Sequence, residues 1–167
     1  MHLLLIRHAI AEDRLEFART GQSDYYRPLN ERGRSRMTRG AAGLRGIVPE
    51  IDILATSPLT RAVQTAEIVA EAYDGLRVER VESLGSGNGE EFLEWLRDCP
   101  SEAVVAAVGH EPTMSDWTAW MLTGRYEDFT VVKKGSAIML AFPYRIRAGE
   151  AELCWFLAPA QLRRLGS

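Results

Sequence analysis

Short apolar runs alternate with amphipathic stretches along most of this chain. Runs too short for a helix are typical of buried strands, and they occupy Leu3–Ile6, Ile51–Ala55 and Val104–Val108. Between them, apolar residues recur at helical spacing from Asn30 to about Gly46 and from Pro58 to about Tyr73. Strands that alternate with helices in this way predict βαβ units and a parallel sheet.

The second half of the chain continues the pattern. Leu76–Val81 alternates and predicts another strand, followed by a glycine-rich loop and a short helix around Phe92–Leu96. A helix is expected after Pro112, and two alternating stretches, Ala137–Phe142 and Glu152–Leu157, predict a strand pair. We therefore expect one domain, residues 1–167, with an α/β fold: a three-layer α/β/α sandwich with a mostly parallel central sheet.

Composition narrows the class of protein. The 167 residues are 46% hydrophobic and 26% charged, with a formal net charge of -3. These values are typical of a globular protein, and the weakly acidic balance argues against nucleic acid as the main partner. The first apolar run is too short for a signal peptide, and no run is long enough to span a membrane. We expect a cytoplasmic protein that binds no membrane.

Imidazole and guanidinium groups follow three of the predicted strands at the point where each ends. Arg7 and His8 follow the first strand, Arg61 lies shortly after the second, and His110 follows the fourth. Each residue alone has an ordinary structural explanation, such as a solvated charge or a hydrogen-bonded turn. Because ligands of open α/β sheets bind beyond the carboxyl ends of the strands, their coincidence there predicts a cationic pocket for phosphate.

Phosphoryl transfer needs these residue types together. Arg7 and Arg61 can grip phosphate oxygens bidentately without losing their charge. A neutral imidazole can attack phosphorus, and the positive neighbours of His8 disfavour its protonation. His110 would then donate to the phosphoryl oxygens, and Ser57, at the start of the next helix, is a further phosphate-binding candidate. No His or Cys cluster has the spacing of a metal site, so neither a metal nor another cofactor is expected.

The same residues resemble the histidine phosphatase superfamily, the phosphoglycerate mutase-like proteins. The chain is similar in particular to the small phosphohistidine phosphatases of the SixA type. Three stretches carry most of the resemblance: Arg7-His8-Ala9, Ser57-Pro58-Leu59-Thr60-Arg61-Ala62-Val63-Gln64-Thr65 and Gly109-His110-Glu111-Pro112. Further matches are Arg27-Pro28-Leu29 with Gly33, Gly135-Ser136-Ala137-Ile138, and Trp155 with Ala158-Pro159.

The resemblance implies a phosphoglycerate mutase-like fold and a division of roles. His8 would be the phosphorylated nucleophile, with Arg7, Arg61 and His110 binding the phosphoryl group and no metal involved. Ala9 stands where the family usually has Gly. If that position needs a positive φ, the alanine costs about 1 kcal/mol, and we expect its methyl group to be tolerated.

The general acid is left open between two carboxylates. Glu82 follows the third predicted strand and Glu111 follows His110, and related phosphomonoesterases carry an acid at one of these places. The alternatives are a solvated loop carboxylate for Glu82 and a helix N-terminal charge for Glu111. A phosphohistidine substrate needs less help from an acid, because imidazole is a better leaving group than an alkoxide.

Three functions are compatible with these sequence features. The first is a phosphatase that removes phosphate from phosphohistidine on a protein, such as one of the histidine-phosphotransfer type. The second is a phosphomonoesterase for a small phosphorylated molecule, which would need Glu82 or Glu111 as its acid. The third is a phosphate-binding module without turnover. The short segments between Arg61 and His110 leave little room for a lid over small metabolites, which favours the first.

Overall fold

A six-stranded mixed sheet in the order β3-β2-β4-β1-β5-β6 forms the centre of the molecule. The computed structural model describes residues 1–166. Its elements, in chain order, are β1 His2–Arg7, α1 Arg14–Ala18, the 3₁₀ helix η1 Asp24–Tyr26, α2 Glu31–Ile47, β2 Ile53–Thr56, α3 Thr60–Ala72, β3 Val78–Arg80, α4 Ser83–Ser86, α5 Gly89–Arg97, β4 Val104–Gly109, α6 Thr113–Thr123, β5 Ala137–Ala141, β6 Glu152–Leu157 and α7 Pro159–Leu165. Within residues 1–166, no helix is long and apolar enough to cross a lipid bilayer.

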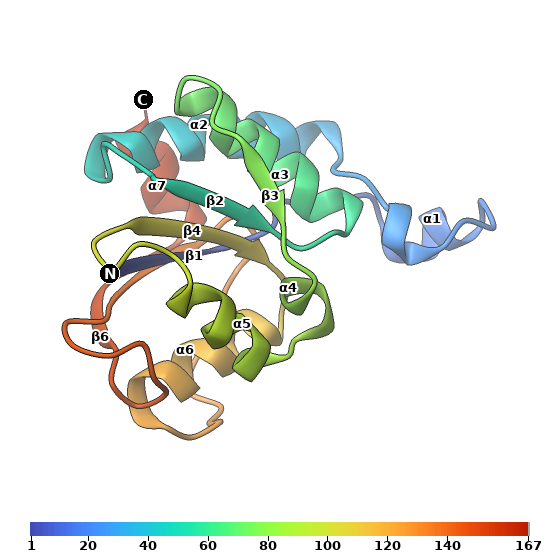
Figure 1. The fold of residues 1–167 in the computed structure, drawn as a ribbon. Helices are drawn as coiled ribbons and strands as arrows, with labels where there is room; N and C mark the ends of the chain where they lie inside the picture. Colours follow the sequence, from blue (N-terminus) through green and yellow to red (C-terminus); the bar gives the residue numbers. More distant parts are fainter. Residues whose placement is uncertain (167) are drawn as a thin grey trace.

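The sheet is mostly parallel, as the sequence predicts. Strands β3, β2, β4 and β1 pair in parallel. Strand β5 pairs antiparallel with both β1 and β6, which confirms the expected strand pair near the end of the chain. The parallel strands therefore have their carboxyl ends along one edge, facing the side where α1 and α4 lie (Figure 1).

Alternating side chains of the strands build a core on each face of the sheet. Leu4 and Ile6 of β1 join the core under α2, α3 and α7, whereas Leu3 and Leu5 join the core against α5 and α6. Figure 1 shows the two helical layers with the sheet between them. This arrangement is the expected three-layer α/β/α sandwich.

Two glycines let helix α2 lie directly against other backbone segments. A side chain at Gly33 would collide with the carbonyl oxygen of Ile10, two residues beyond His8. A side chain at Gly43 would collide with the carbonyl oxygen of Leu162 in α7. Only glycine permits such close approach, so these positions hold α2 against α7 and against the chain that follows β1.

Several short helices depart from the sequence prediction. The segment from Ala11 to Pro28, expected to be an irregular loop, contains α1 and η1, and the glycine-rich loop after β3 contains α4. Helix α7 was not predicted, and β3 is shorter than Leu76–Val81. In α1 the Asp13 side chain accepts hydrogen bonds from Leu15 and Glu16, and no residue of the helix is buried. A helix that is stabilised by capping and buries no side chain has no apolar periodicity, so its sequence pattern does not predict it.

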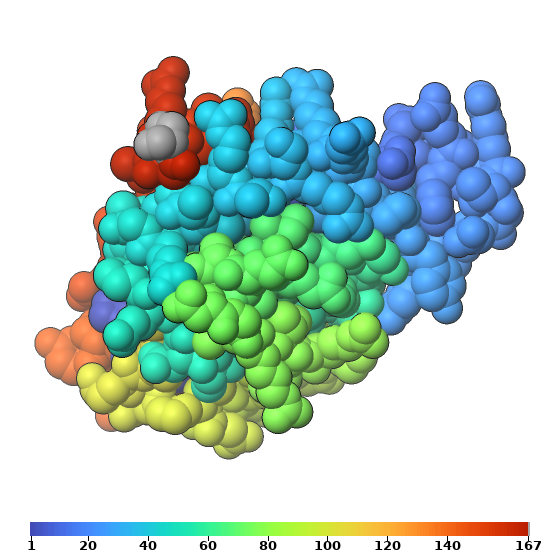
Figure 2. Space-filling view, turned by 90° about the horizontal axis from the view of Figure 1, so that it is seen from above, coloured from blue at the N-terminus to red at the C-terminus, as the bar shows by residue number. Residues whose placement is uncertain are grey.

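Residues 13–27, which we call the arm, extend away from the rest of the molecule. Figures 1 and 2 show the arm, in blue, projecting beyond α2 and α3. The arm returns to the body at Leu29, whose amide donates to the Gln64 side chain in α3 at 2.8 Å. Its η1 helix lies over the carboxyl edge of the sheet through contacts with Arg61, described below.

Candidate active site

Pairing between β1 and β4 places the two histidines beside each other. Arg7 and Gly109 are register partners, and the His8 amide donates to the Gly109 carbonyl at 2.9 Å. The rings of His8 and His110 lie with centroids 5.1 Å apart and tilted by 52°. The Ser57 amide likewise donates to Val108 at 2.9 Å, so the end of β2 joins the same cluster.

The His8 ring is held in one tautomer by the backbone. Its Nδ1 lies 2.7 Å from the Ala9 carbonyl oxygen, which can only accept, so Nδ1 carries the proton. The Ala9 amide in turn donates to Thr65 Oγ1 at 3.0 Å, and the Thr65 hydroxyl donates to the Arg61 carbonyl at 2.7 Å. The first turns of α3 therefore fix the backbone that orients His8, and Nε2 keeps its lone pair.

Burial and neighbouring charge keep both imidazoles neutral. Burial lowers the pKa of His8 to about 2, and His110, Arg61 and Arg7 add to the effect against the opposing hydrogen bond to Ala9. Burial also lowers the pKa of His110 to about 4, again with help from Arg61 and Arg7. At neutral pH, His8 Nε2 is therefore an unprotonated, buried nitrogen among cations.

Ser57 lies against His110 rather than on an open surface. The serine is fully buried, and its Oγ is 2.7 Å from His110 Nε2. This contact fixes the plane of the imidazole. The other ring nitrogen, Nδ1, is buried and has no hydrogen-bond partner within residues 1–166. Ser57, a phosphate-binding candidate from the sequence, thus orients the second histidine in this structure.

Arg7 is held in place by the loop before β5. Its Nη1 donates to the Val132 carbonyl at 2.6 Å, and the Val132 amide donates to Glu111 Oε1 at 2.6 Å. The other oxygen of Glu111 accepts from the Ser115 amide at 3.2 Å and from its hydroxyl at 2.7 Å. Glu111 therefore accepts at both oxygens, caps the start of α6 and steadies Arg7 through Val132.

Arg61 is paired with the arm. Its Nη1 donates to the Asp24 carbonyl oxygen at 3.0 Å, and its Nη2 lies 3.2 Å from Asp24 Oδ2. The Asp24 carboxylate also accepts from Arg27 Nε at 2.7 Å. Burial alone would raise the pKa of Asp24, but the hydrogen bond from Arg27 and the charges of Arg61, Arg27 and Arg14 outweigh it and lower that pKa. Asp24 stays ionised and holds Arg61 in position.

Three buried nitrogens of the cluster have no partner within residues 1–166. They are Arg7 Nε, Arg61 Nε and His110 Nδ1. A buried polar group without a partner costs about 1–3 kcal/mol, more when it is charged, so native proteins keep few of them. An anion placed among these groups would accept their hydrogen bonds and offset the positive charge, which makes phosphate a fitting ligand.

Glu82 and Ala9 border this cluster. Glu82 is exposed and directly precedes α4, in which a side chain at Gly85 would meet Pro58 and the Ser57 hydroxyl. The Glu82 segment therefore lies at the edge of the site. Ala9 does not have a positive φ, and its methyl is buried in the core, so the backbone strain considered from the sequence is not present.

Three residues that hold the site together, Asp24, Thr65 and Val132, were not predicted from the sequence. Asp24 lies in a polar segment whose pattern predicts a solvated loop. Thr65 acts through the backbone of Ala9 and Arg61, and the Val132 carbonyl accepts from the Arg7 side chain. The sequence does place Asp24 three residues before Arg27 and Thr65 four after Arg61, spacings that match one helical turn. Residues 1–166 contain no cluster of three or more His, Cys, Asp or Glu that could hold a metal ion.

Comparison with known proteins places the chain in a family. The family model described as "Histidine phosphatase superfamily (branch 1)" matches residues 3–92, more than half of the chain. The chain belongs to the histidine phosphatase superfamily. An uncharacterised protein of Picosynechococcus sp. is 34% identical to this chain over 143 residues, which is 84% of each protein.

Solved structures support the fold of this superfamily member. The protein histidine phosphatase SixA complexed with tungstate superposes with a TM-score of 0.78 at 24% identity, covering 97% of this chain and 99% of that one. A phosphoserine phosphatase mutant from Entamoeba histolytica, complexed with phosphoserine, gives 0.68 at 17% identity and covers 96% and 98%. Both likenesses show the phosphoglycerate mutase-like α/β fold.

Proposed function

We propose that this protein is a phosphatase that works through a covalent phosphohistidine on His8 and that its substrate is phosphohistidine on a protein. The observation that carries the proposal is the state of the His8 ring. Its Nδ1 proton is committed to Ala9, its Nε2 lone pair is free, and its pKa of about 2 keeps it neutral. Membership of the superfamily supports a phosphatase.

The reaction divides into two displacements at phosphorus. The lone pair of His8 Nε2 forms a bond to phosphorus while the bond from phosphorus to the substrate nitrogen breaks, and the leaving imidazole takes a proton from water. Water then attacks the phosphoryl group on His8, and the bond from phosphorus to Nε2 breaks. The proton that this water loses neutralises the hydroxide left by the first step, so phosphate is released and the neutral ring is restored. Arg7, Arg61 and His110 bind the three equatorial oxygens, where negative charge gathers in both transition states.

The short segments between Arg61 and His110 favour a protein substrate. The chain between them forms α3, β3, α4, α5 and β4, which belong to the sheet or pack on it or on one another. This stretch therefore offers little chain that could enclose a small metabolite, which favours a side chain that projects from another protein. An imidazole leaving group also removes the need for a strong general acid.

A phosphomonoesterase is the second candidate, and the position of Glu82 favours it. Glu82 lies at the edge of the site and is exposed, so its carboxyl group is accessible to a leaving group. Glu111 is less suited to this role because both of its oxygens already accept hydrogen bonds from Val132 and Ser115. Glu82 is therefore the acid that this alternative requires.

Comparing two substrate classes separates the candidates. Rates would be measured for a phosphohistidine-carrying phosphotransfer protein and for a panel of sugar phosphates, with wild type, Glu82→Gln and Glu111→Gln. We expect the phosphoprotein to be preferred and Glu82→Gln to leave its turnover unchanged. A preference for sugar phosphates that is lost in Glu82→Gln would establish the phosphomonoesterase instead.

A trapping experiment tests whether the protein is an enzyme at all. Substrate labelled in its phosphoryl group would be mixed with the protein, quenched in base and examined for an acid-labile label on His8. We expect label on the wild type and none on His8→Ala. Phosphate binding without label and without hydrolysis of any phosphorylated compound would make the protein a binding module.

A further inference from the structure

A small groove runs alongside the backbone that follows the nucleophile. Its volume is about 200 Å³, and its floor is formed by small or apolar residues such as Ala9, Met37 and Pro159. Helices α2 and α7 form its walls with the loop that precedes β5. Pockets that enclose a whole small-molecule ligand usually hold ~300–1,000 Å³, so this groove suits one side chain of a larger partner.

The rim of the groove is strongly basic. Arg36 of α2 and Arg163 of α7 line it from the two helices, and Lys133 and Lys134 line it from the loop. No carboxylate residue is among its lining. The surrounding protein has a formal net charge of -3, so this concentration of positive charge is local.

The positive charges on the rim have no ion-pair partner within the described residues, 1–166. None of the ion pairs formed by residues 1–166 includes Arg32, Arg36, Arg163 or Lys134. Partial burial lowers the pKa of Arg36, and the charges of Arg32 and Arg163 lower it further. Like charges held this close destabilise a fold unless an external anion compensates them.

The groove is continuous with the phosphate cluster. Ala9, on its floor, accepts the hydrogen bond that fixes His8, and the Gly135 amide, also in its lining, donates to the Arg7 carbonyl at 3.1 Å. Lys134 lines the groove and is close enough to the phosphate cluster to be affected by its charges: burial lowers the pKa of Lys134 first, and Arg7, Arg27 and Arg61 lower it further, against a smaller opposing effect of Asp13. One band of positive potential therefore runs from the nucleophile to Arg36 and Arg163.

We propose that this basic groove is a docking site for an acidic segment of the protein substrate, with an apolar side chain on the groove floor and carboxylates over Arg36 and Arg163. The inference rests on the proposed phosphohistidine phosphatase function and adds to it a means of selecting substrates. Carboxylates beside the phosphohistidine complement the rim, whereas a basic surface is repelled. The preferred substrate is therefore a protein whose phosphorylated histidine is surrounded by acidic residues.

Two phosphohistidine peptides test the proposal directly. One carries a leucine and glutamates beside the phosphohistidine, and the other has glutamine at each glutamate position. Hydrolysis would be compared with that of free phosphohistidine, which is too small to reach the groove. The test variants are Arg36→Glu and Arg163→Glu, singly and together.

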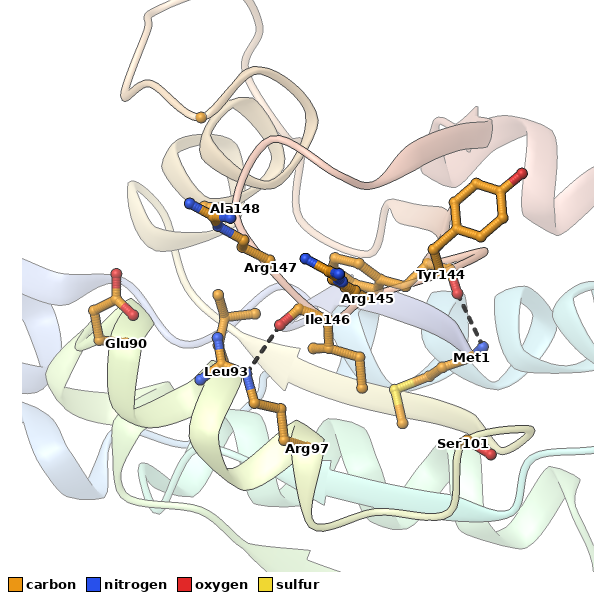
Figure 3. A pocket seen from close by; sticks show the side chains of 12 residues that line it. Met1, Glu90, Leu93, Arg97, Ser101, Tyr144, Arg145, Ile146, Arg147 and Ala148 are labelled. Carbon is orange, nitrogen blue, oxygen red and sulfur yellow. Dashed lines mark hydrogen bonds between the residues drawn. The ribbon is translucent and has the colours of Figure 1, made fainter.

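The matched control is Arg145→Glu. Arg145 is exposed and lines a separate hollow beside Met1, at the amino end of β1 and thus opposite the site (Figure 3). Arg145→Glu introduces the same change in net charge as either single substitution, far from the groove. Circular dichroism melts would verify that each variant is folded.

We expect the wild type to hydrolyse the acidic peptide with a kcat/KM about 10-fold above that of the glutamine peptide, mainly through KM. Arg36→Glu with Arg163→Glu should remove that preference and leave free phosphohistidine unchanged. Raising the salt concentration should weaken the preference, since exposed charges are screened. Equal kcat/KM for both peptides in the wild type, or a preference that survives the double variant, would overturn the proposal.

Binding to an inactive protein separates this inference from the catalytic proposal. Unphosphorylated versions of the two peptides would be titrated into His8→Ala protein, with and without the two groove substitutions. Tighter binding of the acidic peptide that depends on Arg36 and Arg163 supports the groove even if no phosphohistidine compound is hydrolysed. Equal binding of both peptides overturns the groove and leaves the catalytic proposal intact.

Discussion

Two arginine-bearing regions lie at opposite ends of the sheet, and they differ in how their side chains are held. The hollow beside Met1 has a volume of about 830 Å³ and is lined by Arg97, Arg145 and Arg147 (Figure 3). Arg145 and Arg147 are exposed there, and Arg97 Nε donates to the Ile146 carbonyl at 2.9 Å. At the carboxyl end, Arg61 is buried and fixed by Asp24.

The proposed catalytic cluster therefore differs from the hollow beside Met1 in more than its positive charge. The carboxyl-end cluster combines buried cations, a histidine of fixed tautomer and nitrogens without partners within residues 1–166. Water screens the exposed arginines of the other hollow, whereas buried groups act on a ligand at low dielectric. The variants described below alter the carboxyl-end cluster, and matched variants elsewhere in the chain serve as their controls.

The largest effect should come from the nucleophile. His8→Ala should lower turnover by at least ~10⁴-fold, because it removes the Nε2 on which the proposed covalent intermediate forms. His2→Ala, six residues earlier on the exposed start of β1, is the control and should keep full activity. Steady-state rates and thermal melts measure both. Substantial turnover by folded His8→Ala would exclude the covalent mechanism.

The next effect concerns the geometry of the guanidinium. Arg61→Lys should reduce kcat/KM by about 100-fold, because an ammonium cannot keep both contacts to Asp24 and also bind phosphate oxygens. Arg97→Lys in the opposite hollow should leave activity unchanged. Near-normal rates for Arg61→Lys would mean that Arg61 does not bind the phosphoryl group.

A smaller loss of activity is expected when His110 loses its hydrogen-bond partner Ser57. Ser57→Ala removes the 2.7 Å contact to His110 Nε2 and should lower kcat by about 10-fold, with little change in KM. Ser101→Ala, in the lining of the other hollow, serves as the comparison. An unchanged kcat would show that packing alone orients His110.

The smallest effect is on stability in acid. His8 and His110 have pKa values of about 2 and about 4 in the folded protein, below the usual 6.5, so the unfolded chain binds more protons between pH 6.5 and 4. Their contribution to stability is complete above pH 6.5 and is lost progressively as the pH falls toward 4 and below. His8→Gln with His110→Gln should therefore lose less Tm than wild type between pH 7 and pH 5. Equal losses would show that these rings titrate normally.

Much of this architecture could be predicted from local patterns. The buried runs around Leu4, Leu54 and Ala106 mark three parallel strands, and the residues after them carry the site because strand ends share one edge. The short helices α1 and α4 were not predicted, since neither has the periodic apolar face that identifies longer helices. The same limitation hid Asp24, whose partner Arg61 lies 37 residues away.

The sequence alone determined the strands, the longer helices and the identity of the reactive groups, because hydrophobic periodicity and residue chemistry are local properties. Tertiary structure decided which groups act on one another. It brought Asp24 to Arg61, Ser57 to His110 and Glu111 to the loop that holds Arg7. These contacts depend on the register of the strands and on how the chain returns across the whole sheet. The burial and pKa of His8 and His110, and the tautomer of His8, are therefore defined only when the chain has folded.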